Sequence, residues 1–300
     1  MDFFELITEC LGALTLNKMR TGLAVLGIII GIGSVIALIS LGQASQKSIQ
    51  NQIQSLGANL LTVIPSGQNT GGVRGAAGGG TTLTLEDAKA IEVSPQITTI
   101  QGVSPEFSRR TQVTAGRNNT NTQVIGVYPE YANIRKVTVS SGVFITQRDV
   151  DTLAKVVILG STAATNLFGD GVDPIGQNIR AGGQTLRVIG IATPKGGTGF
   201  NNPDDSIYTP LSTAQKQLFG VNYLSSIAVE AKTQDVMTLA QNEIGYFLLG
   251  KHKLNDPSVA DFVIFSQNDI LNTATQVTGT FTTLLGGILQ FPSLLAESAL

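Results

Sequence analysis

A long apolar run dominates the beginning of the chain. Residues 22–41 carry no charge, and only Ser34, Ser40 and the glycines interrupt their apolar side chains. A helix of roughly 20 residues crosses the ~30 Å hydrocarbon core of a bilayer, whereas the apolar part of a signal peptide is usually about 7–15 residues long. The run therefore predicts a retained transmembrane helix over 22–42, with a cleaved leader ending near 42–44 as the alternative.

The residues before this run recur with a helical period. Apolar side chains share one face and acidic side chains lie opposite them, which is typical of a helix on a membrane surface; they are Phe3, Ile7, Leu11 and Leu14 against Asp2, Glu5 and Glu9. We therefore expect a cytoplasmic amphipathic helix over 1–21. Lys18 and Arg20 directly precede the span, so the positive-inside rule places the N-terminus in the cytoplasm.

Helical periodicity continues beyond the apolar run. Ile49, Ile53 and Leu56 recur on one face, and Gly57 is a suitable residue to end a helix. One helix over 22–56 would project roughly 20 Å beyond the bilayer. A strand is expected over 59–64. The Gly-rich stretch 67–80 lacks the GK[ST] ending of a phosphate loop and is expected to be a flexible linker.

Two strand–helix–strand patterns flank a longer middle segment. The first has a helix over 85–93, capped by Thr84 with Asp87 at the capping-box position, and a strand over 97–104. The second has strands over 224–231 and 260–265 around a helix over 234–250. This order predicts a split ferredoxin-like arrangement.

The middle segment, 106–219, predicts a small inserted α/β subdomain. Strands are expected over 109–115 and 120–128 with a turn at 116–119, a helix capped by Ser161 after the buried strand in "KVVILG", and a hairpin at Gly182-Gly183. The expected fold class is a membrane α-helix plus an extracytoplasmic α+β domain over 43–270. Its split part comprises 57–105 and 220–266, and 106–219 is inserted between them.

Composition excludes several classes of function. The net charge is −2 and charged residues make up 13% of the chain, so nothing indicates nucleic-acid binding. Cys10 is the single cysteine, which excludes an internal disulfide and a cysteine-based zinc site. Glycine is abundant, and Gly27, Gly31 and Gly33 in the span indicate either a helix–helix contact or the usual glycine content of membrane helices.

The candidate chemical residues favour structural roles. His252, the only histidine, stands in "LGKHKLND", where a helix-terminal or solvated position is expected rather than a catalytic triad. Asp170, Asp173, Asp204 and Asp205 match no calcium loop and fit ordinary turns. The loop 193–202 is either a partner contact or a plain loop, and Arg109 and Arg110 either line a surface contact or lie on a solvated edge strand. No catalytic, cofactor-binding or metal-binding residue is predicted.

Six stretches of the sequence resemble motifs of one protein family and occur in the same order as in that family. They are "NKMRTGLAVLGIIIGIGSVIALISLGQ", "SLGANLLTVIP", "LTLEDAKAI", "VVILGSTAATNLFG", "DPIGQNIRAGGQTLRVIGIA" and "DDSIYTPLSTAQKQLFG". Over residues 3–289 the chain resembles the permease subunits of MacB-like ABC transporters, the macrolide-exporter and FtsX-type superfamily, with their periplasmic core domain. The resemblance implies a porter-like subdomain with an inserted α/β subdomain, between the first and second of four membrane helices in the cell membrane.

The resemblance also implies a function and partners. It implies a homodimer in membrane lipid that transmits cytoplasmic ATP hydrolysis to the extracytoplasmic domain and so drives efflux of drugs, peptides or lipoproteins. It allows a membrane-fusion protein and an outer-membrane channel as further partners. This chain has no phosphate-loop motif, so the ATP-binding subunit is expected to be a separate protein and this subunit to be non-catalytic.

The end of the chain departs from the family pattern. Residues 271–289 are expected to begin a second transmembrane helix, but the tail 290–300 contains Pro292 and Glu297, which suit a membrane helix poorly. We therefore expect a C-terminally truncated product. The alternative function is a membrane-anchored extracytoplasmic binding or sensory domain without energy coupling, for which one span suffices.

The expected topology can be tested by labelling. Cysteines introduced at Asn118 and Asn202 should react with a membrane-impermeant reagent in intact cells or spheroplasts, because both lie beyond the span, while Cys10 should stay unlabelled. Labelling of Cys10 alone would show the opposite orientation.

Overall fold

The computed structural model describes residues 18–56, 59–70, 73–75, 80–196 and 202–266, together with Asp269, Gln276, Gly279 and Thr280. Two units divide the chain, one of residues 1–51 and 271–300 and the other of 52–270. The predictions for the amphipathic helix before residue 18, for Cys10, for the cap at Gly57, and for the second span and the tail beyond Thr280 lie outside the described residues.

Helix α2 runs without interruption from Lys18 to Leu56, over 39 residues, which confirms the predicted continuous helix. Gly27, Gly31 and Gly33 lie on α2 with open space where a Cβ would be. None of the helices, as far as their residues are described, is long and apolar enough to cross a membrane. The side chains of Ile49, Ile53 and Leu56 are outside the described set.

The second unit has two lobes that share one strand. The first lobe consists of β1 (Leu60–Pro65), α3 (Leu85–Val93), β4 (Ile100–Ala115) as far as Glu106, β11 (Ser226–Ala231), α8 (Met237–Lys251) and β12 (Phe262–Ser266). Its strands lie in the order β12-β1-β11-β4, and all neighbours are antiparallel. Two short 3-10 helices, η3 (Gln234–Val236) and η4 (Pro257–Val259), flank α8.

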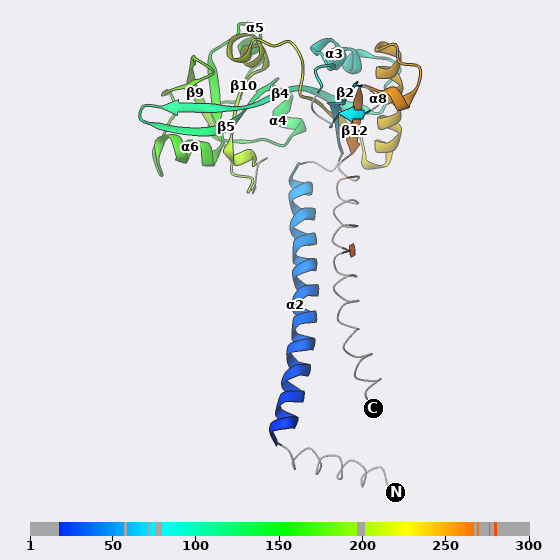
Figure 1. The fold of residues 1–300 in the computed structure, drawn as a ribbon. Coiled ribbons are helices and arrows are strands. Elements are labelled where there is room, and N and C mark those ends of the chain that lie inside the picture. Colours follow the sequence, from blue (N-terminus) through cyan, green and yellow to red (C-terminus); the bar gives the residue numbers. More distant parts are fainter. Residues whose placement is uncertain are drawn as a thin grey trace. The chain divides into compact units, whose positions relative to one another are not determined.

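The second lobe is formed by the continuous segment from Phe107 to Phe219. It contains β5 (Asn118–Val127), α4 (Tyr131–Ile134), β6 (Val139–Gly142), α5 (Gln147–Asp151), β7 (Val156–Leu159), α6 (Ser161–Phe168), β8 (Asn178–Ala181), β9 (Gln184–Ala192), η1 (Pro203–Asp205), β10 (Ser206–Pro210), α7 (Leu211–Thr213) and the π-helix η2 (Ala214–Phe219). Pairing runs from β4 through β5, β10, β7, β9 and β8 back to β4, so six strands close into a ring. Figure 1 shows the long hairpin of β4 and β5 reaching away from α3 and α8.

Buried apolar side chains form the cores of both lobes. In the first lobe α3 and α8 contribute Ile91, Ile244 and Leu248 to one cluster with Leu61 and Val63 of β1. In the second lobe two clusters form, one with α6 and the other with α4 and α5. The first-lobe cluster also includes Phe107, Leu211 and Ala214, so its core extends past the lobe boundary.

Several local predictions are confirmed. Helix α3 begins with the predicted capping box, in which the Thr84 hydroxyl accepts from the Asp87 amide at 3.3 Å and the Thr84 amide donates to the Asp87 carboxylate at 2.8 Å. The β8–β9 hairpin turns at Gly182 and Gly183, whose φ values of 54° and 81° are left-handed and suit glycine.

Three local predictions are wrong. The strands expected over 97–104 and 109–115 are one strand, β4. Gly160, not Ser161, is the N-cap of α6, and no side chain caps that helix. The stretch 67–80 is not only a linker, because β2 (Gly67–Thr70) pairs with β3 (Val73–Gly75) within it.

Two glycine-to-alanine substitutions should change stability in opposite directions. A Cβ at Gly160 would collide with the carbonyl oxygen of Asp204 and lie 2.8 Å from that of Ser206, so Gly160→Ala should lower the free energy of unfolding by about 1–3 kcal/mol. Gly250 in α8 has open space at that position, so Gly250→Ala should raise it by about 0.5–1 kcal/mol. Urea unfolding of both variants tests this; equal effects would contradict the backbone contact at Gly160.

Candidate functional site at the junction of the lobes

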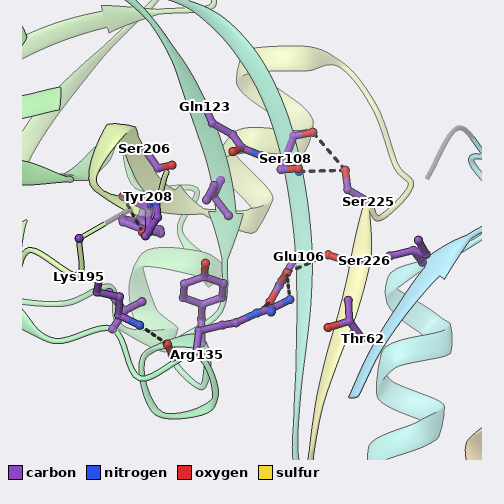
Figure 2. Close-up of a pocket in the computed structure, with 16 residues that line it drawn as sticks. Thr62, Glu106, Ser108, Gln123, Arg135, Lys195, Ser206, Tyr208, Ser225 and Ser226 are labelled. Atoms are coloured by element: carbon purple, nitrogen blue, oxygen red, sulfur yellow. Dashed lines mark hydrogen bonds and ion pairs between the residues drawn. The ribbon is translucent and has the colours of Figure 1, made fainter. Parts of the chain in front are cut away.

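A cavity of about 560 Å³ lies where the two lobes meet. Figure 2 shows the labelled polar side chains of its lining, which surround one open space. The first lobe contributes Thr62 and Ile64 of β1, Ser225 and Ser226 at β11, and Glu106 of β4. The second lobe contributes Ser108, Gln123, Ile125, Tyr131, Arg135, Val137, Lys195, Gly196, Pro203, Ser206 and Tyr208.

A buried ion pair joins the lobes beside this cavity. Arg135 Nε lies 2.8 Å from Glu106 Oε1, and its Nη2 donates to Oε2 at 2.9 Å. The hydroxyl of Ser226 donates to the same Oε2 at 2.8 Å (Figure 2). The side chains of Glu106 and Arg135 are only 8% and 19% exposed, so the pairing compensates two charges that are largely removed from water.

The local electrostatics keep Arg135 ionised. Burial by itself would lower the pKa of Arg135, but the adjacent Glu106 carboxylate raises it well above its usual range. Lys195, which donates to the carbonyl oxygen of Arg135 at 2.6 Å, has a lowered pKa because of burial and then of the nearby guanidinium. The charged groups that line the cavity are therefore the Glu106–Arg135 pair and Lys195, beside hydroxyl and amide groups.

Aspartate Asp204 fixes the described ends of the loop 193–202. Its carboxylate accepts the backbone amides of Lys195 at 2.8 Å and Gly196 at 2.9 Å, and its own amide donates to Asn202 at 3.0 Å. Residues 197–201 lie outside the described set, so neither alternative for this loop, a partner contact or a plain loop, is tested.

Two tyrosines form the aromatic wall of the cavity. The rings of Tyr131 and Tyr208 are 5.6 Å apart, and the Tyr208 hydroxyl donates to the carbonyl oxygen of Pro203 at 3.3 Å. Burial raises the pKa of both phenols, so both stay neutral hydrogen-bonding groups at physiological pH.

The only histidine belongs to a second charged cluster, inside the first lobe. His252 is the C-cap of α8, as expected of a helix end, but its side chain is only 12% exposed, so the solvated position is wrong. Its Nδ1 lies 2.8 Å from Asp261 Oδ1, and its Nε2 lies 3.5 Å from Asp87 Oδ1, which Lys251 also contacts at 2.8 Å. Both ring nitrogens face carboxylates, so the ring ties α3, α8 and the start of β12 together.

Contacts within this cluster shift the pKa values of His252 and Asp87. The contacts with Asp87 and then Asp261 raise the pKa of His252, although burial acts in the opposite direction. Burial alone would raise the pKa of Asp87, but hydrogen bonds from His252, Lys251 and Thr84 bring it well below its ordinary value.

The remaining predicted candidates are separate from both clusters. Asp173 accepts the amide of Ile175 at 3.0 Å, as in an ordinary turn, and Asp170 is exposed nearby. Asp205 lies 3.8 Å from Arg110. In the described ranges no three histidine, cysteine or acidic side chains come together as a metal site.

Arg109 and Arg110, two of the candidates from the sequence, lie on an exposed part of β4. The guanidinium carbon of Arg109 is 5.4 Å from the ring centroid of Phe219, and Arg110 donates to the carbonyl oxygen of Asn121 at 3.0 Å. This stretch pairs with β5 on one edge, and on its other edge it lies between the residues that pair with β11 and those that pair with β8. The arrangement fits the edge-strand alternative, and the surface-contact alternative is not tested.

The sequence reasoning missed the junction itself. Glu106 and Arg135 were not singled out, since their pairing joins residues 29 positions apart. One signal was present: Glu106 is a single acid inside an apolar, strand-like stretch, "VSPEF". A buried acid in such a place requires a cationic or hydrogen-bonding partner.

Comparison with known proteins gives one family. The family model described as "MacB-like periplasmic core domain" matches residues 21–245. The macrolide export ATP-binding/permease protein MacB of Bdellovibrio bacteriovorus is 34% identical over 288 residues, covering 96% of this chain and 44% of that protein. Its namesake from Chlorobaculum tepidum is 36% identical over 248 residues, covering 83% and 38%. The chain thus spans less than half the length of these relatives.

Solved structures share the fold. The periplasmic region of MacB from Actinobacillus actinomycetemcomitans matches with a TM-score of 0.61 and 23% identity, over 75% of this chain and 97% of that one. The extracellular domain of the ABC-type transporter YknZ from Gram-positive bacteria matches with a TM-score of 0.56 and 18% identity, over 69% and 100%.

The histidine cluster predicts how stability depends on pH. Because the pKa of His252 is raised in the folded state, its stabilisation is complete below the unfolded value of about 6.5 and is lost as the pH rises through the folded pKa. The lowered pKa of Asp87 acts at the other end, where stabilisation is lost on acidification. The free energy of unfolding should therefore fall as the pH rises above about 6.5.

Matched variants separate this effect from general destabilisation. Denaturant unfolding of His252→Gln should show no such alkaline decline, whereas Lys251→Met should be less stable but keep it, because lysine does not titrate in this range. The same alkaline slope in His252→Gln and in the unaltered protein would show that another group is responsible.

Proposed function

The chain belongs to the family of MacB-like periplasmic core domains, and from this premise we propose that it is the permease subunit of an ABC-type exporter. In this proposal the second unit is the extracytoplasmic domain, with porter-like parts over 57–105 and 220–266 and an inserted subdomain over 106–219. The similarity to proteins named for macrolide export supports an efflux role. The substrates proposed are drugs, peptides or lipoproteins.

The proposed membrane position depends on the sequence of α2. Its residues 22–41 carry no charge, and their described large apolar side chains are exposed, Leu23 at 65% and Ile30 at 62%. An exposed apolar surface of this kind suits a lipid or helix partner. We therefore place 22–42 across the cell membrane, 1–21 in the cytoplasm, 43–270 outside, and a second span from 271.

The proposed subunit transmits work and performs no chemistry. Cytoplasmic ATP hydrolysis by a separate ATP-binding subunit would displace α2 in a homodimer, and the displacement would reach the outer domain. A membrane-fusion protein and an outer-membrane channel are the further partners proposed. The observation that supports this mechanism is the continuity of α2, whose 39 residues form one helix. Such a helix is about 58 Å long, and roughly 20 of its residues suffice to cross a bilayer.

The alternative is an anchored binding or sensory domain without energy coupling. The cavity of about 560 Å³ between the lobes favours it, because binding sites often lie at such junctions. The two functions differ in what α2 must do: a coupled permease needs a stiff helix, whereas an anchored binding domain needs only a tether.

A proline in the part of α2 beyond the span tests the proposal. Ser48→Pro, introduced into the complete transporter, should kink the helix at a cost of roughly 3 kcal/mol or more and reduce the substrate exported per ATP hydrolysed. The outer domain should still fold, because its described cores begin at Leu60 and contain no residue of α2.

The matched control is Ser48→Ala, which keeps the helix and should export normally. Equal export per ATP by the proline and alanine variants would identify α2 as a tether and would favour the anchored binding domain.

A further inference from the structure

Three consecutive residues of the second lobe dock onto the first-lobe sheet. Ile134, at the end of α4, packs with Leu60 of β1 and Ala228 of β11 in a small buried cluster. Glycine at position 102 leaves room for it, because a Cβ there would lie 3.3 Å from Ile134 Cδ1. This contact is separate from the cluster that α3 and α8 form with the sheet.

The next two residues add ion pairs with the same sheet. Arg135 makes the two-pronged contact with Glu106 described above. Lys136 Nζ lies 3.2 Å from Glu230 Oε1 of β11. Lys136 also adopts a left-handed backbone conformation, with φ of 53°, which a lysine rarely takes. Apolar, buried ionic and exposed ionic contacts therefore coincide in one segment, 134–136.

The covalent connections between the lobes are narrow. One is β4 as it passes from Glu106 to Ser108, and the other is the chain over 220–225. At this point the hydroxyl of Ser225 accepts the Ser108 amide at 2.9 Å and donates to the Ser108 carbonyl at 3.2 Å. On the edge of β4 that faces β11, backbone pairing ends at Glu106 and this side chain takes its place, while β4 is paired with β5 from Phe107 onward.

Space is unfilled on two sides of this connection. The cavity of about 560 Å³ includes Glu106 and Ser108 in its lining. A second cavity of about 130 Å³ lies between Lys89 of α3 and Glu130 of the second lobe, with Pro105 in its lining. Phe107 itself is 1% exposed and packs with Leu211 and Ala214 in the first-lobe cluster. This shared contact therefore lies at the pivot, where a swing displaces side chains least, and the two unfilled spaces lie beside it.

We propose that residues 134–136 form a latch that holds the lobes in the closed arrangement of this structure, and that its release lets the second lobe swing about β4 near Phe107. In the closed state Glu106 and Arg135 neutralise one another with only 8% and 19% of their side chains exposed. In the open state both enter water, and the cavity at the junction widens. The proposal concerns the conformation of this chain and does not depend on its role in export.

Removing one partner of the buried pair should favour the open state. A buried charge without its partner is strongly unfavourable, and swinging the lobes apart hydrates it. Arg135→Met leaves the Glu106 carboxylate with only the Ser226 hydroxyl. The variant should therefore populate the open arrangement at least tenfold more than the unaltered protein.

The test measures the distance between the lobes in the full chain in detergent micelles. Spin labels are attached to cysteines replacing Arg117, at the β4–β5 turn, and Asn242, on α8, both of which are exposed, in a Cys10→Ser background. Double electron–electron resonance should give one distance for the unaltered latch and a second, separate distance in Arg135→Met. Arg187→Met, an exposed arginine of β9, is the matched control and should keep the single distance.

Each outcome decides the proposal. A single unchanged distance in folded Arg135→Met would overturn it. If Arg135→Met does not fold, Lys136→Met decides instead, since it removes only the more exposed pair with Glu230; it should raise the open population two- to threefold, and an unchanged distribution would overturn the latch. Restoration of the single distance by Arg135→Lys, which keeps the charge, would support it.

Discussion

Strand β4 belongs to both lobes, and its backbone hydrogen bonds constrain them together. Residues 100–106 pair with β11, residues 107–115 pair with β5, and residues 113 and 114 also pair with β8. The register of the first-lobe sheet therefore sets where the second-lobe ring begins. At the crossover the backbone amide and carbonyl of Ser108 no longer pair with the backbone of β11. Both are hydrogen-bonded by the hydroxyl of one serine, Ser225. The buried pair of Glu106 with Arg135 lies directly at this crossover, where it joins the lobes through side chains as β4 joins them through the backbone.

The accuracy of the sequence predictions follows the range of the interactions that form each element. The capping box of Thr84 and the Gly182-Gly183 turn depend on neighbours within three residues, and both were predictable.

That β4 is one continuous strand was not predictable, because a proline such as Pro105 usually interrupts a strand. The Glu106 carbonyl accepts the Ser225 amide at 2.9 Å and so faces β11. The nitrogen of Pro105 therefore faces the other side, where the pairing with β5 begins only at Phe107. A missing N–H is tolerated there, but only the tertiary arrangement shows it.

The charged clusters were out of reach for the same reason. His252 was placed correctly at a helix end, yet its burial depends on Asp87, 165 positions earlier in the chain, and on Asp261. The carboxylate of Asp87 was assigned one local role, in the capping box, but it also accepts from Lys251 at 2.8 Å. Local patterns reveal what a side chain does for its own helix; they do not reveal which distant helix end is brought against it.

The lobes also differ in how the chain supplies them. The second lobe is one continuous segment, while the first lobe is assembled from strands on either side of it, with β1 and β11 as paired neighbours. Since synthesis proceeds from the N-terminus and domains fold as units, the ring can close before β11, α8 and β12 have left the ribosome. Until then β1 and α3 lack most of their apolar partners. During synthesis the first lobe therefore completes its core after the second lobe.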